Sequence, residues 1–227
     1  MSDAEHTREP KYLFRRFEQW ALPRMAAALP KWVMPDHMTA LGFLAAGGIG
    51  ICYASSGYSV NFLWAANALW IVNWIGDSLD GTLARVRRTE RPRYGYYLDH
   101  IMDMFSVAFV CIGLGFSPYL LLSVGLAALI MYYLMSINVY LETFVMKTFQ
   151  FGYEHIGPTE VRVILIILGS ALALGFEPVI ELKDTPLGAL DFIFLLGLIV
   201  MLVMLLRRIF SNLRALAALE PPNVVKQ

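Results

Sequence analysis

Six stretches of mostly apolar residues, each about as long as a membrane crossing, occupy most of this chain. They lie near residues 38–57, 60–84, 96–116, 119–146, 160–176 and 187–206. A hydrocarbon core about 30 Å thick needs about 20 helical residues, and backbone polar groups surrounded by lipid must find partners within their own segment. The pattern therefore predicts an all-α membrane protein with six transmembrane helices, the third and fourth separated only by a corner at residues 116–118.

A further helix is predicted before the first span. Between Pro10 and about Lys31, aromatic and aliphatic residues alternate with basic residues at helical spacing. Such a helix lies in the membrane interface, although a helix packed on the bundle would give the same pattern. Residues 1–9 are polar, and we expect them to be disordered and to contain no cleavable signal peptide. We divide the chain into a cytoplasmic N-terminal segment (1–34), a six-helix catalytic domain (35–210) and a cytoplasmic tail (211–227).

Composition and charge fix the class of protein and its orientation. The 227 residues are 58% hydrophobic and 16% charged, which is too apolar for an ordinary soluble domain. With both termini cytoplasmic, 17 of the 18 lysines and arginines lie on the inner side, and only Lys183 lies outside, in an acidic loop at residues 177–184. This asymmetry agrees with the positive-inside rule. We expect a multi-pass protein of a bacterial inner membrane.

Small residues are frequent in the first span, especially at residues 42–50. In membrane helices such residues let two backbones approach closely, so we interpret them as packing positions. Cys52 and Cys111 both lie inside apolar spans, and their spacing matches no metal motif or disulfide framework. They too are expected to be packing residues.

Four aspartates within the apolar spans carry the clearest chemical signal. Asp77 and Asp80 are three residues apart, and Asp99 and Asp103 are four apart, so each pair shares a helix face. A short loop joins the two antiparallel spans, so the pairs should face each other near the cytoplasmic end. Ionised carboxylates are costly in a membrane, and hard oxygen ligands suit Mg²⁺, Mn²⁺ or Ca²⁺. The simpler alternative is ion pairing with the loop arginines, which are Arg87, Arg88, Arg91 and Arg93.

Residues beside these carboxylates suggest a phosphate ligand. Gly81 and Ala84 leave their stretch of helix bare, so a ligand can approach the backbone. Arg85 follows at the spacing of one turn and can bind phosphate oxygens through two parallel hydrogen bonds. The combination predicts a pyrophosphate or phosphodiester site.

The sequence D-S-L-D-G-T-L-A-R at residues 77–85, followed by G-Y-Y-L-D-H-I-M-D at residues 95–103, resembles the signature of the CDP-alcohol phosphotransferase family. Nine residues separate the two halves, one more than the family pattern. The segment P-D-H-M-T at residues 35–39 also resembles the family's P-N-x-x-T motif, with Asp36 in place of asparagine.

The resemblance implies an enzyme that transfers a substituted phosphate from a CDP-alcohol to a second alcohol and releases CMP. It implies one or two bound Mg²⁺ or Mn²⁺ ions, a homodimer and no nucleic-acid partner. Several residues would take family roles: metal ligation by Asp77, Asp80 and Asp99, metal ligation or general base catalysis by Asp103, room for the nucleotide at Gly81 and Ala84, and phosphate binding by Arg85.

The choice of substrates leaves alternatives open. We favour CDP-diacylglycerol as donor and a polar alcohol as acceptor, so that one of the two partners is a lipid. The segment G-P-T-E at residues 157–160 resembles the ethanolamine and choline phosphotransferases, which use a CDP-aminoalcohol and diacylglycerol. Lys147, Arg162 and Arg207 or Arg208, at the inner ends of the last three spans, are candidates for binding a phosphorylated acceptor, or they anchor the helices by snorkelling.

The sequence also leaves two alternative functions open, and several other polar and aromatic residues need an interpretation. A cation transporter also places carboxylates within a membrane, although such sites usually lie near the midplane, and a purely structural membrane protein is the weakest alternative. Glu142 is either a site carboxylate or a partner of Lys147. We expect packing or interfacial roles for the remaining candidates, namely His37, His100, His155, Trp70, Trp74, Tyr132 and Tyr133.

Overall fold

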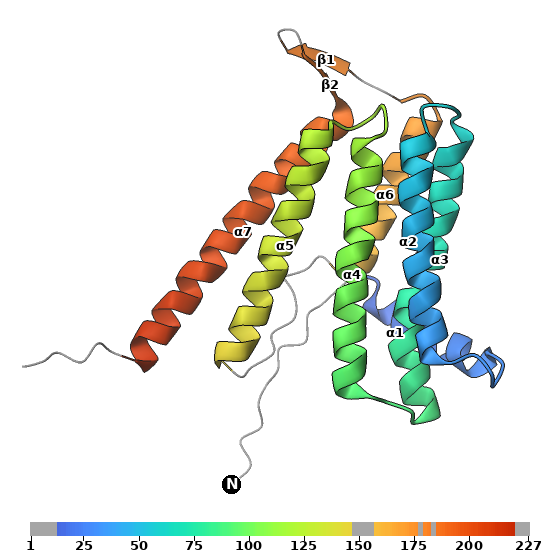
Figure 1. Cartoon of the computed structure of the whole chain (residues 1–227), viewed down its shortest axis with the longest axis vertical. Coiled ribbons are helices and arrows are strands. Elements are labelled where there is room, and N and C mark those ends of the chain that lie inside the picture. Colours follow the sequence, from blue (N-terminus) through green and yellow to red (C-terminus); the bar gives the residue numbers. More distant parts are fainter. Residues whose placement is uncertain (1–12, 147–156, 177–178, 183–184, 221–227) are drawn as a thin grey trace, which may run out of the picture.

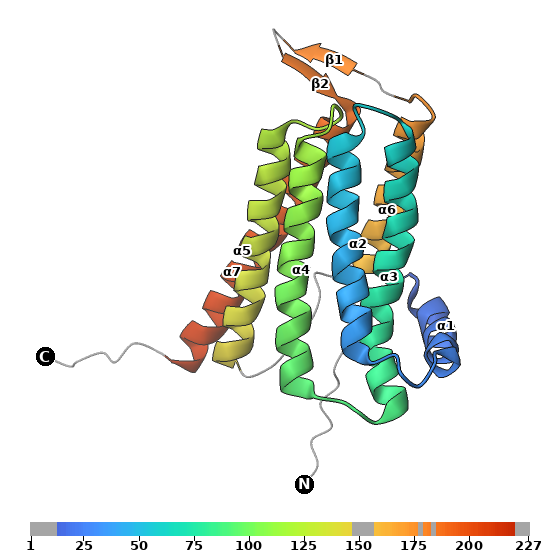
Figure 2. The ribbon, with the colours of Figure 1, turned by 45° about the vertical axis from the view of Figure 1, so that its right-hand side comes forward.

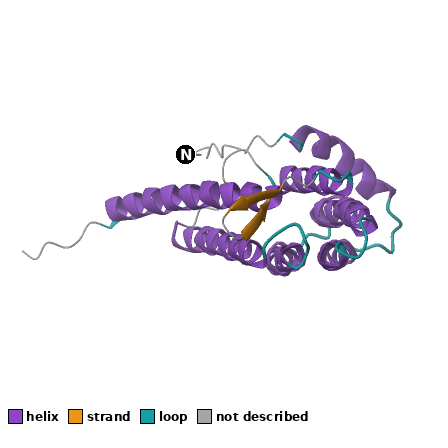
Figure 3. Cartoon of the chain, turned by 90° about the horizontal axis from the view of Figure 1, so that it is seen from above, coloured by secondary structure: helices purple, strands orange, loops and turns teal. Residues whose placement is uncertain are grey.

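The computed structural model describes residues 13–146, 157–176, 179–182 and 185–220, and these form seven helices and one two-stranded antiparallel sheet (Figure 1). The elements are α1 (Arg15–Ala28), α2 (Pro35–Ser55), α3 (Asn61–Arg87), α4 (Pro92–Gly115), α5 (Leu122–Met146), α6 (Pro158–Ala173), β1 (Val179–Leu182), β2 (Thr185–Gly188) and α7 (Ala189–Leu219). Helices α2 to α7 lie side by side, and α1 lies near the end of the bundle opposite the hairpin (Figures 1 and 2). Seen from above, the strands lie over the bundle (Figure 3).

All six predicted apolar segments form helices, α2 to α7. Within the described part of the chain, four of these are long and apolar enough to cross a membrane: α2, α4, α5 and α7. Helix α6 has 16 residues and would extend about 24 Å, while α3 carries several charged residues near its C-terminal end. Large apolar side chains of α7 are half to two-thirds exposed, as in Leu196, Ile199 and Val203. Such a surface indicates a multi-pass protein in lipid rather than in water.

The boundaries differ from the prediction at the C-terminal half. Helix α7 continues to Leu219 instead of ending near residue 206. The segment that follows residue 206 contains good helix formers, and the first proline after it is Pro221. Helix α5 begins at Leu122, after a longer corner than predicted. The predicted outer loop contains β1, whose four residues are too few to give a sequence signal. Residues 1–9 lie outside the described residues.

Helix α2 packs against both α3 and α4 through contacts between glycines. A Cβ added to Gly76 would lie 2.4 Å from the backbone nitrogen of Gly42, and one added to Gly113 would lie 2.3 Å from the carbonyl oxygen of Gly50. Backbones can meet this closely only where side chains are absent. The predicted packing role of the small residues is confirmed, and α2 becomes the element that fixes α3 and α4 in space.

The main apolar core lies in the half of the bundle near the hairpin. Tyr53 and Trp70 are buried there, and the Trp70 Nε1–H donates to the Tyr53 hydroxyl at 2.9 Å. Cys52 and Cys111 are both buried and carry free thiols. Their predicted role as packing residues is confirmed. A second, smaller apolar core lies in the opposite half, where Leu22, Met38 and Leu83 are buried together beside the polar residues described below.

Helix α1 is shorter than predicted and packs on α3. Ala21, Leu22 and Ala26 are buried against the bundle, while Phe17 and Trp20 remain about half exposed. This agrees with the alternative prediction, in which the helix packs on the bundle. The helix also has an exposed aromatic side. This exposed side is the one that a membrane interface would meet.

Helices α5 and α7 are joined by a buried ionic contact. The Arg208 guanidinium donates to both carboxylate oxygens of Glu142, at 2.7 Å and 3.1 Å, and the Asn212 side chain donates to the same carboxylate at 3.0 Å. Glu142 was expected to be a site carboxylate or a partner of Lys147. Its partners are instead on α7, and Lys147 lies outside the described residues.

We expect Arg208→Met to lower the free energy of unfolding by roughly 2 kcal/mol, less than the 3–5 typical of a broken buried ion pair because Asn212 still donates to Glu142. The measurement is thermal unfolding of the detergent-purified protein. The double variant Arg208→Met with Glu142→Met removes the stranded carboxylate and should recover most of the loss. Equal loss in both variants would contradict the ionic explanation.

Candidate functional site

The site forms where the C-terminal end of α3 meets the N-terminal end of α4. Arg88 ends α3 in the left-handed conformation, with φ of 55°, and the backbone nitrogen of Thr89 donates to the carbonyl of Ala84. This is the usual way in which a chain leaves a helix sharply. The chain then re-enters α4 at Pro92, a favoured first residue of a helix. The two helices therefore run antiparallel, and both pack on α2.

Three of the four predicted aspartates converge. Asp77 of α3 and Asp99 and Asp103 of α4 each offer a carboxylate oxygen, and these oxygens lie within 4.8 Å of one another. All three residues are partly buried. Asp77 reaches this position because the close approach of Gly42 and Gly76 holds α3 against α2. We refer to these three aspartates as the carboxylate cluster.

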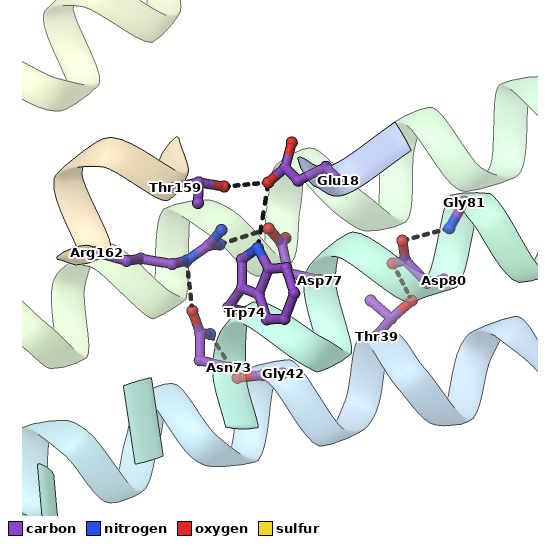
Figure 4. A network of polar contacts seen from close by, with 10 residues as sticks. All are labelled: Glu18, Thr39, Gly42, Asn73, Trp74, Asp77, Asp80, Gly81, Thr159 and Arg162. Atoms are coloured by element: carbon purple, nitrogen blue, oxygen red, sulfur yellow. Dashed lines mark hydrogen bonds and ion pairs between the residues drawn. The ribbon is translucent and has the colours of Figure 1, made fainter. Parts of the chain in front are cut away.

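Asp80 lines the same cleft but makes different contacts. Its carboxylate accepts a hydrogen bond from the Thr39 hydroxyl of α2 at 2.8 Å and one from the backbone nitrogen of Gly81 at 2.5 Å (Figure 4). Thr39 closes the P-D-H-M-T segment noted in the sequence. This segment therefore acts as a support for a site carboxylate.

A cleft of about 480 Å³ contains the whole predicted signature. All four aspartates line it together with Gly81, Ala84 and Arg85. The space over Gly81 is open except for the Arg85 guanidinium, which would lie 3.5 Å from an added Cβ. Arg85 also donates to the Thr82 hydroxyl at 3.0 Å. A cleft of this volume is within the usual range for a small-molecule ligand.

An ion pair also lines the cleft. Arg91, before α4, donates to the Asp36 carboxylate, and its guanidinium lies 3.9 Å from the centre of the Tyr94 ring. This hydrogen bond to Asp36 raises the pKa of Arg91. The pair does not support the alternative in which the loop arginines neutralise the four predicted aspartates, because Asp36 is not one of them.

Arg162 of α6 reaches the carboxylate cluster. Its Nη2 donates to Asp77 at 2.5 Å, its Nε donates to the side-chain oxygen of Asn73 at 2.9 Å, and the Asn73 amide donates to the carbonyl of Gly42 at 2.9 Å (Figure 4). The Arg162 side chain is 12% exposed. Its guanidinium is therefore a buried cation in contact with the cluster, and it is more than a surface anchor.

Among the other basic candidates that the structure describes, Arg207 is exposed on α7 and Arg208 is paired with Glu142. Lys147 and His155 lie outside the described residues. His37 accepts a hydrogen bond from the Met34 backbone at the start of α2. His100 lines the cleft, packs against the rings of Tyr96 and Tyr140, and lies 3.7 Å from the Asp99 carboxylate.

Sequence reasoning missed two supporting groups. Asn73 lies four residues before Asp77 and so shares its helix face. A polar asparagine at this spacing in an apolar span could have been predicted to lie at the site. Glu18 of α1 accepts hydrogen bonds from Trp74 Nε1 at 3.2 Å and from the Thr159 hydroxyl at 2.5 Å (Figure 4). This contact links α1, α3 and the start of α6, and nothing in the local sequence reveals it.

The donor set fits a hard divalent ion. The cluster offers only carboxylate oxygens, and these are the ligands that Mg²⁺ and Mn²⁺ prefer. Asp99 and Asp103 come from one helix and Asp77 from another, so one ion could bridge α3 and α4. Asp80 is not part of this group of oxygens, but Thr39 and Gly81 hold it in the same cleft, where it would add a further negative charge.

Comparison with known proteins agrees with this arrangement. The family model described as CDP-alcohol phosphatidyltransferase matches residues 32–210, most of the chain, which confirms the resemblance noted in the sequence. Among curated proteins, the chain is 36% identical over 94 residues to a protein of Methanothermobacter thermautotrophicus named archaetidylinositol phosphate synthase. That alignment covers 41% of this chain and 45% of the relative, so the chain matches less than half of the relative's length.

Proposed function

This chain belongs to the CDP-alcohol phosphatidyltransferase family, and we propose that it is a membrane enzyme that transfers a substituted phosphate from a CDP-alcohol to an alcohol acceptor and releases CMP. The observation that carries the proposal is the convergence of Asp77, Asp99 and Asp103 in a cleft that Gly81, Ala84 and Arg85 also line. We place this chemistry in a catalytic domain of residues 35–210.

In this proposal each residue has a definite task. Asp77, Asp80, Asp99 and Asp103 hold one or two Mg²⁺ or Mn²⁺ ions, which would supply the positive charge that stabilises the leaving CMP. Arg85 binds a phosphate of the donor, and the bare helix at Gly81 and Ala84 admits the nucleotide. Asp103 takes the proton from the acceptor hydroxyl. The acceptor oxygen bonds to the β-phosphorus as the bond from that phosphorus to the bridging oxygen breaks, and CMP departs with that oxygen.

We propose CDP-diacylglycerol as donor and a polar, phosphorylated alcohol as acceptor. The name of the archaeal relative supports this choice, since it describes a lipid that carries an inositol phosphate headgroup. Among the basic candidates for holding an acceptor phosphate, which are Lys147, Arg162 and Arg207, contact with the site supports Arg162. Arg207 remains a weaker candidate because its side chain is exposed.

The rival branch, with a CDP-aminoalcohol and diacylglycerol, rested on the G-P-T-E segment. In the structure Glu160 of this segment accepts hydrogen bonds from the backbone nitrogens of Gly157, at 3.0 Å, and Phe14, at 3.2 Å. Thr159 donates to Glu18. These contacts explain the segment as the start of α6 and its attachment to α1, so it lends little support to that branch. A cation transporter is disfavoured because the carboxylates lie on two continuous helices, in the halves of α3 and α4 nearer their connecting loop, whereas transport sites usually lie on broken helices.

We further propose six membrane-crossing helices, with α3 and α6 completing the four apolar ones. Both termini would be cytoplasmic and the cleft would open to the cytoplasm of a bacterium, where CMP dissolves while the acyl chains of the lipid substrate stay in the membrane. The distribution of basic residues supports this orientation, and so does the position of α1 and the end of α7 opposite the hairpin (Figure 1). A homodimer is proposed by resemblance to the family.

CMP release by the detergent-purified protein with Mg²⁺ tests the proposal. One reaction would contain CDP-diacylglycerol and a pool of polar alcohols and their phosphates, and the other CDP-ethanolamine and CDP-choline with diacylglycerol. We expect release in the first reaction only, and loss of that release when EDTA removes the metal. Release in the second reaction only would assign the protein to the aminoalcohol branch, and no release in either would contradict the proposed activity.

A further inference from the structure

We propose that Arg162 is the resident counter-ion of the carboxylate cluster: it is hydrogen-bonded to Asp77, it competes with a divalent ion for that carboxylate, and Asn73 keeps it in place. The inference rests on the proposed metal site. It assigns Arg162 a function toward the cation, whereas the sequence suggested acceptor binding or helix anchoring.

The contact with Asp77 is direct and buried. Nη2 of Arg162 lies 2.5 Å from Oδ2 of Asp77, and the two side chains are 12% and 26% exposed. Asp77 is also one of the three residues whose oxygens could hold an ion. A guanidinium and a divalent ion on the same carboxylate would repel each other, and partial burial weakens the screening of that repulsion by water.

The guanidinium is held on a second side by Asn73. The Asn73 side-chain oxygen accepts from Arg162 Nε, and its amide nitrogen donates to the Gly42 carbonyl of α2, each at 2.9 Å. Asn73 is buried, and both of its polar atoms are used in this chain of hydrogen bonds. Arg162 is therefore fixed in the orientation in which it faces Asp77, and Asn73 is a positioning residue that acts through it.

The backbone that carries Arg162 is also restrained near the site. Thr159 lies three residues before Arg162 on the same face of α6, and Trp74 lies three residues before Asp77 on α3. Glu18 of α1 accepts from both Thr159 and Trp74 (Figure 4). This contact holds the start of α6 against α3, which keeps the arginine within reach of the cluster.

Charge sets the direction of the expected effect. The cluster contributes three carboxylates, and Arg162 offsets one of those charges without help from a metal. Arg162→Gln removes the positive charge and keeps a long polar side chain, so a divalent ion should bind more tightly. Arg162→Lys keeps the charge but loses the planar fork and with it the contact to Asn73, so its effect should lie between those of the unaltered protein and Arg162→Gln.

The test measures Mn²⁺ binding by electron paramagnetic resonance in detergent without substrates. We expect Arg162→Gln to lower the dissociation constant about tenfold and Asn73→Ala about threefold, since each weakens the competition of the guanidinium for Asp77. Arg162→Lys should lower it about as much as Asn73→Ala, because lysine keeps the charge but loses the same contact with Asn73. The matched control is Asn67→Ala, which removes another amide contact between α3 and α6, from Asn67 to Ser170 at 2.9 Å.

The outcomes separate this inference from the proposed function. Asp99→Asn should abolish Mn²⁺ binding if the cluster holds the ion. If it does, and Arg162→Gln leaves binding unchanged or weakens it, the counter-ion inference alone is wrong. If Asn67→Ala tightens binding as much as Asn73→Ala, helix packing rather than the arginine sets the affinity. If Asp99→Asn leaves Mn²⁺ binding intact, both the metal site and the inference are overturned.

Discussion

We expect the Asp103→Asn variant to release CMP about 10³-fold more slowly than the unaltered protein. Asparagine has almost the same shape as aspartate, so the packing of α4 should survive. It carries no charge and does not accept the proton of an acceptor hydroxyl, so the variant loses the general base. The carboxylate of Asp103 lies in the cluster with Asp77 and Asp99, so the substitution also removes one of its negative charges.

The measurement is CMP release in Mg²⁺ under saturating donor and acceptor, with thermal unfolding recorded on the same preparation. Ser106→Ala is the matched control, because Ser106 lies on α4 three residues after Asp103 and lines, together with Asp103, a second and smaller pocket that also borders Asp77 and Asp99. It should keep near-normal turnover. Turnover by Asp103→Asn within about tenfold of the unaltered protein would remove Asp103 from the proposed catalytic role, since a general base contributes 10²–10⁴-fold.

The cluster could be predicted because its information is local. Spacings of three and four residues put each aspartate pair on one helix face, and a short loop forces the two helices to run antiparallel. What spacing does not give is the rotation of each helix. Three of the aspartates converge, while Asp80 binds Thr39 of α2. That difference depends on how closely α2 and α3 approach, which Gly42 and Gly76 decide.

The partners of Arg162 and Glu142 were not predictable from local sequence. Arg162 and Asp77 are 85 residues apart, and only the packing of α6 on α3 brings them together. Arg208 meets Glu142 because α5 and α7 start at the same end, where the Asp191 carboxylate accepts from the backbone nitrogen of Leu121 at 2.8 Å. From that shared start, Glu142 and Arg208 lie at nearly the same distance along their helices.

The acceptor and counter-ion proposals for Arg162 fit one sequence of events. In the structure, the arginine is bound to Asp77 and Asn73. An ion at the cluster would neutralise Asp77 and weaken the hold on the guanidinium, which would then be free to meet a phosphate. Under this scheme the metal must bind before a phosphorylated acceptor, and Asn73→Ala should relax that order.

Gly76→Leu should prevent correct folding, and we expect a loss of more than about 3 kcal/mol in the free energy of unfolding, at or beyond the upper end for an overpacked core. A Cβ at this position would lie 2.4 Å from the Gly42 nitrogen, 2.6 Å from its Cα and 2.7 Å from the Met38 carbonyl. All three atoms are backbone, so no side-chain rotation can relieve the clash, and α2 must move away from α3.

That movement would break the site as well as the fold, because α2 supplies Thr39 to Asp80 and the Gly42 carbonyl to Asn73. Gly197→Leu is the matched control, since a Cβ there meets nothing within 4 Å. Size-exclusion profiles and thermal unfolding in detergent should show a monodisperse, stable control and an aggregated or strongly destabilised Gly76 variant. Equal stability of the two variants would mean that the close contact of α2 and α3 does not hold the carboxylates in place.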